Sequence, residues 1–211
     1  MIMNTDLRQS LIHASRQFHQ LGWMAGTAGN LSAKMPDNSF WITASSKKKG
    51  KLVTEDFVRM SLTGEILENP APNNKPSAET SIHQAIYSLF PDANACYHVH
   101  SVEAKLVSNF IAHERLPLPP IEMLKGLGIW QENPKVYMPV FENYLEVSRI
   151  AEDIIQRFKQ TTPDVPGLLI RNHGVTVWAT SPEAAENHIE LVEYIFRYIV
   201  AARQAGLNFQ H

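Results

Sequence analysis

Three histidines in two separate segments have the residue type and spacing of a metal site. His98 and His100 are two positions apart in CYHVH, so on a strand both imidazoles point to the same face. His173 lies in RNHGV between two short apolar stretches, where Gly174 allows a sharp turn. Taken alone, the pair fits a surface position equally well. Together, three imidazoles leave a fourth zinc position open, as in catalytic sites, and nitrogen ligands favour Zn²⁺ over Mg²⁺.

A metal with an open position needs a group that moves protons, and two glutamates are candidates. Glu79 lies in PSAET near a predicted helix start, where the helix dipole favours a carboxylate with or without a catalytic role. Glu122 follows two prolines in PPIEMLKG and precedes apolar residues, so we expect it at the edge of a pocket, where desolvation tunes a carboxyl for proton transfer. These local patterns leave the choice between the two open.

Two polar segments contain groups that can hold a phosphate. Residues 26–30 (GTAGN) offer backbone amides, and residues 43–47 (TASSK) offer hydroxyls beside a positive charge. Neither has the spacing of a nucleotide-binding loop, and such glycine and asparagine residues more often simply form turns. The lysine run at 47–49 is expected in a solvated loop rather than in a nucleic-acid patch. The remaining isolated histidines are assigned to surface or packing positions: His13, His19, His83, His113 and His188.

Composition excludes several classes of protein. With 44% apolar and 19% charged residues, the chain is too hydrophobic to remain unfolded. Nineteen basic against twenty-one acidic residues give a net charge of −2, so no positive excess is available for nucleic acid or anionic lipid. No apolar run approaches the roughly 20 residues of a membrane span, and the start lacks a signal-peptide core. The lone Cys96 cannot form an internal disulfide. We therefore expect a cytoplasmic protein without nucleic-acid or membrane partners.

The hydrophobic periodicity predicts the elements that position these residues. Helices are expected over residues 7–21, 77–89, 102–110, 144–158 and 182–205. Strands are expected on both sides of a turn at 36–38, in a hairpin of 58–60 with 66–67, and at 95–100, 136–140, 168–170 and 175–178. A loop is expected at 116–120, and the middle of the chain is the hardest part to interpret. Helices alternating with short strands predict a single α/β domain over residues 1–211 with a mixed or mostly antiparallel sheet.

Five motifs, GTAGNLS, ITASS, PSAET, HVHS and NHGV, follow one another in an order that resembles the class II aldolase/adducin family over nearly the whole chain. The resemblance implies a three-layer α/β/α domain around a mostly antiparallel sheet, commonly a homotetramer with active sites near subunit boundaries. It implies one Zn²⁺ per subunit, with three ligands: His98, His100 and His173. It also implies a set of residues around a substrate phosphate: Asn30, Ser45, Ser46 and Ser77. Ser46 stands where many relatives have glycine.

Within the family, PIEMLKGLG, GWMAGTAGN and the C-terminal helix after NHGVTVWA are most similar to a subgroup that dehydrates 5-methylthioribulose 1-phosphate in methionine salvage. This similarity implies that Glu122 removes the C3 proton and returns it to the departing C4 hydroxyl, giving a 2,3-diketone. Lys125 would help to hold the phosphate, although a salt-bridging surface lysine is an equal interpretation.

Two other functions stay open from the sequence. Glu79 matches the catalytic glutamate of the family's sugar-phosphate aldolases, so carbon–carbon cleavage or epimerisation of another sugar phosphate remains an alternative. Adducin-type relatives use the same fold for protein interaction without catalysis. Such a domain is expected to lose the histidine triplet, which is complete here. The expected partner is therefore a small-molecule sugar phosphate, together with further copies of the chain.

Overall fold

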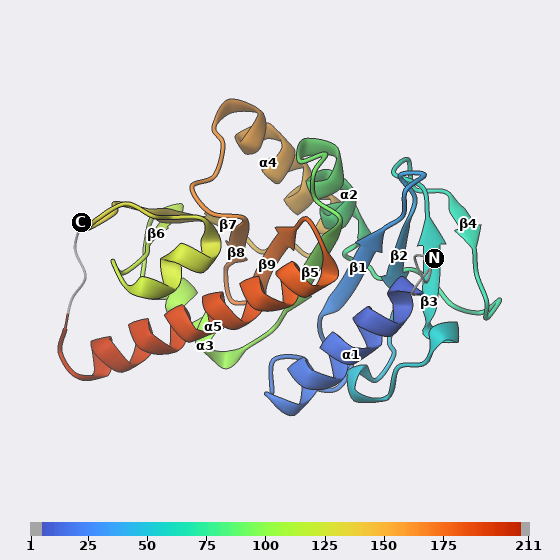
Figure 1. Ribbon diagram of the computed structural model, residues 1–211, viewed down its shortest axis with the longest axis horizontal. Coiled ribbons are helices and arrows are strands. Elements are labelled where there is room, and N and C mark those ends of the chain that lie inside the picture. Colours follow the sequence, from blue (N-terminus) through green and yellow to red (C-terminus); the bar gives the residue numbers. More distant parts are fainter. Residues whose placement is uncertain (1–5, 208–211) are drawn as a thin grey trace.

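A nine-stranded sheet runs through residues 6–207, the part of the chain that the computed structural model describes (Figure 1). In chain order its strands are β1 (Asn30–Lys34), β2 (Phe40–Thr43), β3 (Phe57–Met60), β4 (Ile66–Glu68), β5 (Ala95–Val99), β6 (Arg115–Pro117), β7 (Tyr137–Phe141), β8 (Gly167–Ile170) and β9 (Gly174–Ala179). Across the sheet their order is β4-β3-β2-β1-β5-β9-β8-β7-β6. Strands β7 and β8 pair in parallel, and the other neighbours are antiparallel. The predicted mostly antiparallel sheet is confirmed.

Helices cover both faces of this sheet and give the predicted three layers. They are α1 (Leu7–Gln20), α2 (Thr80–Leu89), α3 (Val102–Ser108), α4 (Val147–Gln160) and α5 (Pro182–Gln204), with short 3₁₀ segments η1 (Lys49–Lys51), η2 (Thr54–Asp56) and η3 (Glu122–Leu127). Helices α1, α3 and α5 share one apolar core, and α2 and α4 share the other, on opposite sides of the sheet (Figure 1). No helix in the described range is long and apolar enough to cross a membrane.

The alternation of side chains along β5 decides which face of the sheet carries the histidines. Tyr97 belongs to the same apolar core as Phe196 of α5, whereas its neighbour Cys96 belongs to the other core, with Ile86 of α2. Because side chains two apart on a strand point the same way, His98 shares the face of Cys96. The two histidines of the HVH motif therefore point to the side of the sheet that α2 covers.

The structure differs from the expected pattern at helix α2 and at strand β6. Helix α2 begins at Thr80 rather than at 77, which leaves Glu79 at the N-cap position. Part of the loop expected at 116–120 forms β6, which pairs with β7 at the edge of the sheet. Proline lacks the N–H that a central strand needs but is tolerated at a sheet edge, so Pro117 does not prevent this pairing.

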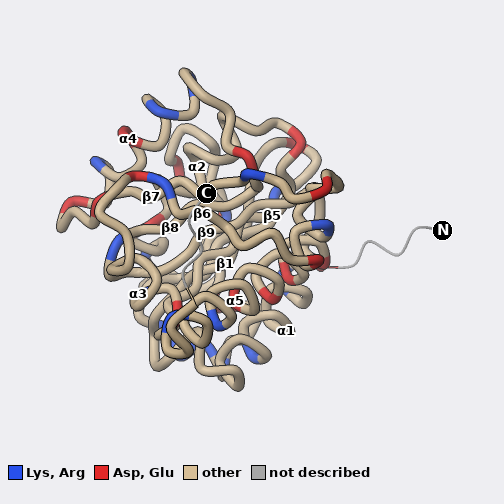
Figure 2. Tube along the Cα trace, turned by 90° about the vertical axis from the view of Figure 1, so that its left-hand side faces the viewer, with Lys and Arg blue, Asp and Glu red and all other residues tan. Residues whose placement is uncertain are grey.

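Basic and acidic residues are interspersed along the trace (Figure 2).

Candidate metal centre

Three polar residues from distant parts of the chain form a row across the middle of the sheet. Asn30 on β1 pairs in register with His98 on β5, and His98 pairs with Thr176 on β9. His98 Nδ1 lies 2.9 Å from the Thr176 hydroxyl oxygen. When Nδ1–H donates to that oxygen, the proton-free Nε2 is left for a metal.

The structure brings His173 to the pair formed by His98 and His100. The ring centroid of His98 lies 4.6 Å from that of His100 and 5.0 Å from that of His173, and the centroids of His100 and His173 are 4.5 Å apart. All three pairs of rings meet edge to face. The Nε2 atoms of His98 and His100 are 2.8 Å apart. Candidate ligand atoms of these three residues and Glu79 all lie within 4.8 Å of one another. Four ligand groups thus converge on one point.

Close strand packing at Gly174 makes this convergence possible. His173 lies in the tight turn between β8 and β9, and its N–H donates to the Ile170 carbonyl at 3.1 Å. A Cβ atom on Gly174 would lie 2.1 Å from the Val99 carbonyl oxygen and 3.1 Å from His100 Cδ2. Real Cβ atoms do not approach backbone so closely, so glycine is required for β9 to lie this near the end of β5.

Glu79 joins the cluster directly before helix α2. Its Oε1 lies 2.7 Å from His173 Nε2, and its Oε2 lies 3.6 Å from His98 Nε2 and accepts a hydrogen bond from the Asn30 amide. Burial raises the pKa of Glu79, but its interactions with the imidazoles of His98 and His173, including the hydrogen bond to His173, outweigh burial and hold that pKa well below its usual range. Glu79 is therefore an ionised carboxylate at neutral pH.

The donor set fits a divalent transition-metal ion. Burial lowers the pKa of His98 to about 4 and that of His100 to about 2, so both imidazoles are neutral, as ligands must be. Among the described residues, the buried Nδ1 of His173 has no hydrogen-bond partner. Three imidazoles and one carboxylate match the ligands that such ions take in proteins.

The residues expected around a phosphate lie beside this cluster. Segments 44–46 and 75–77 meet through a β-bridge between Ala44 and Pro76, and the Ser45 N–H donates to the Lys75 carbonyl at 2.8 Å. The Ser77 hydroxyl accepts a hydrogen bond from the Glu79 N–H at 3.3 Å. Ser46 has φ = 62°, in the left-handed region that favours glycine. Asn30 turns its amide to Glu79 instead of to this surface.

The expectation that the lysine run at 47–49 is solvated is wrong for Lys49. Its side chain is only 2% exposed, and its amine donates to the carbonyls of Thr27 and Lys47 at 2.8 and 3.1 Å. These carbonyls supply the polar partners that a buried amine needs, and burial lowers the pKa of Lys49 to about 8. The amine joins the two segments assigned to phosphate binding. Lysine next to glycine in KKGK gave no sign of this burial.

The structure does not bring Glu122 to the histidines within one chain. Glu122 begins η3, its side chain is 82% exposed, and its Oε1 lies 3.7 Å from Lys125 Nζ. The expected desolvation of Glu122 is therefore wrong for the single chain. Lys125 lines a concavity of about 620 Å³ together with Ala179 and Thr180. Since Ala179 pairs with Ala95 at the start of β5, this concavity lies at the opposite end of the strand from the histidines.

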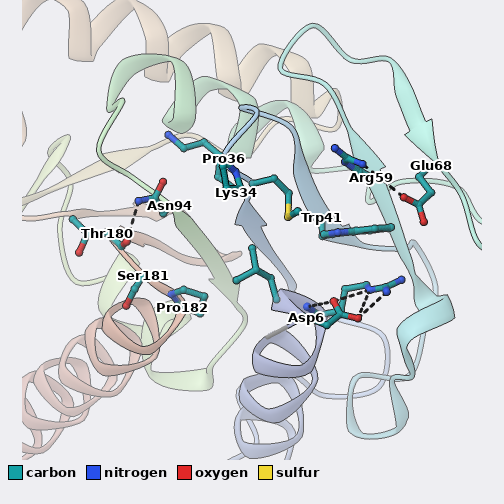
Figure 3. A pocket seen from close by; sticks show the side chains of 13 residues that line it. Asp6, Lys34, Pro36, Trp41, Arg59, Glu68, Asn94, Thr180, Ser181 and Pro182 are labelled. Atoms are coloured by element: carbon teal, nitrogen blue, oxygen red, sulfur yellow. Dashed lines mark hydrogen bonds and ion pairs between the residues drawn. The ribbon is translucent and has the colours of Figure 1, made fainter. Parts of the chain in front are cut away.

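A larger concavity, of about 740 Å³, also lies away from the histidines. It is lined by the end of β1 and by residues 180–182, where α5 begins, among others (Figure 3). Two of its cationic side chains are paired with carboxylates: Arg8 Nη2 lies 2.7 Å from Asp6 Oδ2, and Arg59 Nη1 lies 3.8 Å from Glu68 Oε2. The cluster of potential metal ligands found in the described residues is at the other end of β5.

Comparison with known proteins agrees with this geometry. The family model of the class II aldolase and adducin N-terminal domain matches residues 9–200. A protein of Microcystis aeruginosa (strain NIES-843 / IAM M-2473) named methylthioribulose-1-phosphate dehydratase is 64% identical over 200 residues, covering 95% of this chain and 98% of that protein. A protein of the same name from Persephonella marina (strain DSM 14350 / EX-H1) is 37% identical over 186 residues, covering 87% and 84%.

Solved structures have the same fold. YgbL from Escherichia coli superposes with a TM-score of 0.79 at 26% identity, covering 93% of this chain and 89% of that chain. An L-fuculose 1-phosphate aldolase superposes with a TM-score of 0.80 at 23% identity, covering 99% and 91%, which is evidence for the fold alone. The order of the motifs, the three-layer fold and the family match over residues 9–200 lead to one conclusion. This chain belongs to the class II aldolase and adducin N-terminal domain family.

Proposed function

We propose that this chain is a metal-dependent dehydratase that converts 5-methylthioribulose 1-phosphate into 2,3-diketo-5-methylthiopentyl 1-phosphate and water, in methionine salvage. The observation that carries the proposal is 64% identity, over nearly the full length of both chains, to a protein named for this reaction. The converging His98, His100 and His173 supply the metal ligands that such chemistry needs. We propose Zn²⁺ because imidazole nitrogens predominate. When bound, the ion supplies Lewis acidity that makes the C3 proton of the substrate more acidic.

The chain's own residues would bind the phosphate and orient the sugar. Ser45, Ser46 and Ser77 supply hydroxyls and amides beside Glu79, and the buried Lys49 amine adds positive charge behind the two loops. Charge-assisted hydrogen bonds of this kind fix an anion strongly. Anchoring the phosphate would place C3, rather than C1, next to the proton carrier.

We propose that Glu122 is that proton carrier and that it enters the site from a neighbouring subunit of a homotetramer. It would take the proton from C3 and deliver it to the C4 hydroxyl, which leaves as water, and the resulting enol tautomerises to the diketone. The exposure of Glu122 and the position of its neighbour Lys125 near the far end of β5 support delivery to another chain. Lys125 Nζ lies 3.7 Å from Glu122 Oε1, so Lys125 would enter the same neighbouring site and contact the phosphate there.

A second candidate function is a sugar-phosphate aldolase or epimerase that uses Glu79. It is favoured by the position of Glu79, which lies 2.7 Å from His173 inside the cluster, whereas Glu122 is outside it. The four converging ligand groups argue against a noncatalytic interaction domain. We also propose the cytoplasm as the compartment, since the single cysteine, Cys96, is buried and unpaired.

Incubation of the purified protein with 5-methylthioribulose 1-phosphate, following diketone formation, tests the proposed reaction. Glu122→Gln is expected to lower kcat by roughly 10²- to 10⁴-fold, the usual contribution of a general acid or base, while leaving the metal content unchanged. If Glu122→Gln retains turnover and Glu79→Gln abolishes it, the assignment of roles is wrong. Release of glycolaldehyde phosphate or dihydroxyacetone phosphate from other sugar phosphates would support the aldolase instead.

Mixed oligomers test the delivery of Glu122 between subunits. Glu122→Gln and His98→Ala chains are each expected to be inactive alone. Co-expressed in one oligomer, they should regain activity, because the intact histidines of one chain meet the intact Glu122 of the other. Mixed oligomers that stay inactive would show that both residues act within one chain. Metal analysis of protein purified without added metal tests the zinc assignment.

A further inference from the structure

A chain of buried hydrogen bonds leads from the metal centre into the interior beside α2. Asn30 and Ser32 lie two residues apart on β1 and point to the same face, and His83 and Tyr87 lie one turn apart on α2. The links run from Glu79 to Asn30, then to His83, Ser32 and Tyr87. All five side chains are buried.

The two ends of the Asn30 amide fix the donor in each of these hydrogen bonds. The NH₂ group of Asn30 can only donate, and it faces Glu79 Oε2. The amide oxygen of Asn30 then faces His83 Nε2, which must carry the proton. Burial lowers the pKa of His83 to about 4, so its ring carries a single proton and its Nδ1 accepts a hydrogen bond.

The remaining two links complete the same direction. His83 Nδ1 lies 2.6 Å from the Ser32 hydroxyl oxygen, which therefore donates to it. The Tyr87 hydroxyl lies 2.7 Å from the same oxygen and donates in turn. Every donor in the chain thus points towards Glu79. Such a one-way chain holds its members in a single orientation, because reversing one link leaves two donors or two acceptors facing each other.

We propose that His83 is a positioning residue for the metal centre. By donating to the Asn30 amide oxygen, it keeps the NH₂ group of Asn30 on Glu79 Oε2 and leaves Oε1 facing His173. Without a donor at position 83, the buried amide oxygen of Asn30 has no partner and the amide is held only by its hydrogen bond to Glu79, so neither Asn30 nor the carboxylate that it contacts keeps a fixed position. This inference rests on the proposed metal-dependent function, since it concerns how the chain orients a carboxylate beside the metal ligands.

Substitution of the metal by Co²⁺ in the full-length protein tests this role without substrate. His83→Leu keeps a similar volume but removes both ring nitrogens. It is expected to change the visible Co²⁺ absorption spectrum and to weaken Co²⁺ binding by about 10- to 100-fold, as loss of such supporting contacts does in other metal sites. His83→Gln retains one donor and one acceptor, so it should restore the spectrum and most of the affinity.

Tyr87→Phe is the matched control, because it removes a buried hydrogen bond from the same chain but leaves the donor to Asn30 in place. Its thermal stability should fall while its Co²⁺ spectrum stays that of the unsubstituted protein. A normal spectrum and normal affinity in His83→Leu, or equal defects in His83→Leu and His83→Gln, would overturn the proposal. Normal Co²⁺ binding by the unsubstituted protein without dehydratase activity would instead refute the proposed function alone.

Discussion

Replacement of Gly174 by alanine should dismantle the metal centre without touching a ligand. The new Cβ would lie 2.1 Å from the Val99 carbonyl oxygen, whereas carbon and oxygen in non-bonded contact are normally about 3.3 Å apart or more. Relief requires β9 and β5 to separate by about 1 Å at their ends, where His100 and His173 are attached. A displacement of about 1 Å at a reacting site costs roughly 100-fold in rate. We therefore expect kcat/KM to fall by about that factor.

Metal content by elemental analysis and turnover of the sugar phosphate measure this effect, and Gly167→Ala on β8 is the matched control. The nearest atom to a Cβ on Gly167 is the end of the flexible Met138 side chain, at 3.3 Å, so the sheet need not move. This control should bind metal and turn over substrate like the unsubstituted protein. A Gly174→Ala protein with full metal content and activity would refute the idea that backbone contact between β5 and β9 fixes the ligands.

Three further substitutions have signs that follow from the structure. Glu193 on α5 is 1% exposed, and burial raises its pKa to about 8 from the ordinary 4.5, so the folded state keeps a proton that the unfolded state has lost. The free energy of unfolding should therefore fall as the pH rises from about 5 to 8. Glu193→Gln should remove this pH dependence and raise the free energy of unfolding by about 3 kcal/mol at pH 7, as measured by denaturant unfolding. Parallel pH profiles for the two proteins would contradict this. Thr176→Val removes the hydrogen-bond partner of His98 Nδ1 and should weaken metal binding by about 10- to 100-fold, as measured by competition with a chelator. An unchanged metal affinity would contradict this role of Thr176. Ser46→Gly relieves a positive φ at some cost in chain entropy, and the net effect should stabilise the fold by about 0.5–1 kcal/mol. The melting temperature should therefore rise slightly, and a lower melting temperature would contradict this.

Local patterns in the sequence were sufficient for the succession of helices and strands and for placing His98 and His100 on one face of their strand. Alternation along a strand depends only on neighbouring residues, which is why the common direction of His98 and His100 follows from the HVH spacing. Helix ends were predicted to within a few residues, because capping residues and apolar periodicity are also local. His173 was included through its motif, and its contact with the pair depends on strand pairing that spacing alone does not specify.

Residues whose role depends on distant partners were missed. His83 has an ordinary helical position in TSIHQAIY, and its importance comes from Asn30 and Ser32 on another strand. Lys49 is buried because carbonyls from another loop surround its amine. The burial expected for Glu122 from its proline-rich surroundings failed because flanking apolar residues do not determine which way one side chain points.

The row formed by Asn30, His98 and Thr176 has a consequence for how the protein is made. Its three strands are neighbours in space, yet β9 leaves the ribosome only after most of the chain has been synthesised. Closing so long a loop costs entropy that the pairing of β9 with β5 must offset before the third imidazole arrives. Capture of the ion therefore cannot guide the early stages of folding, and a nascent chain that stops before β8 has an unpaired edge on β5 and lacks His173. Metal uptake is accordingly a marker of completed assembly of the sheet.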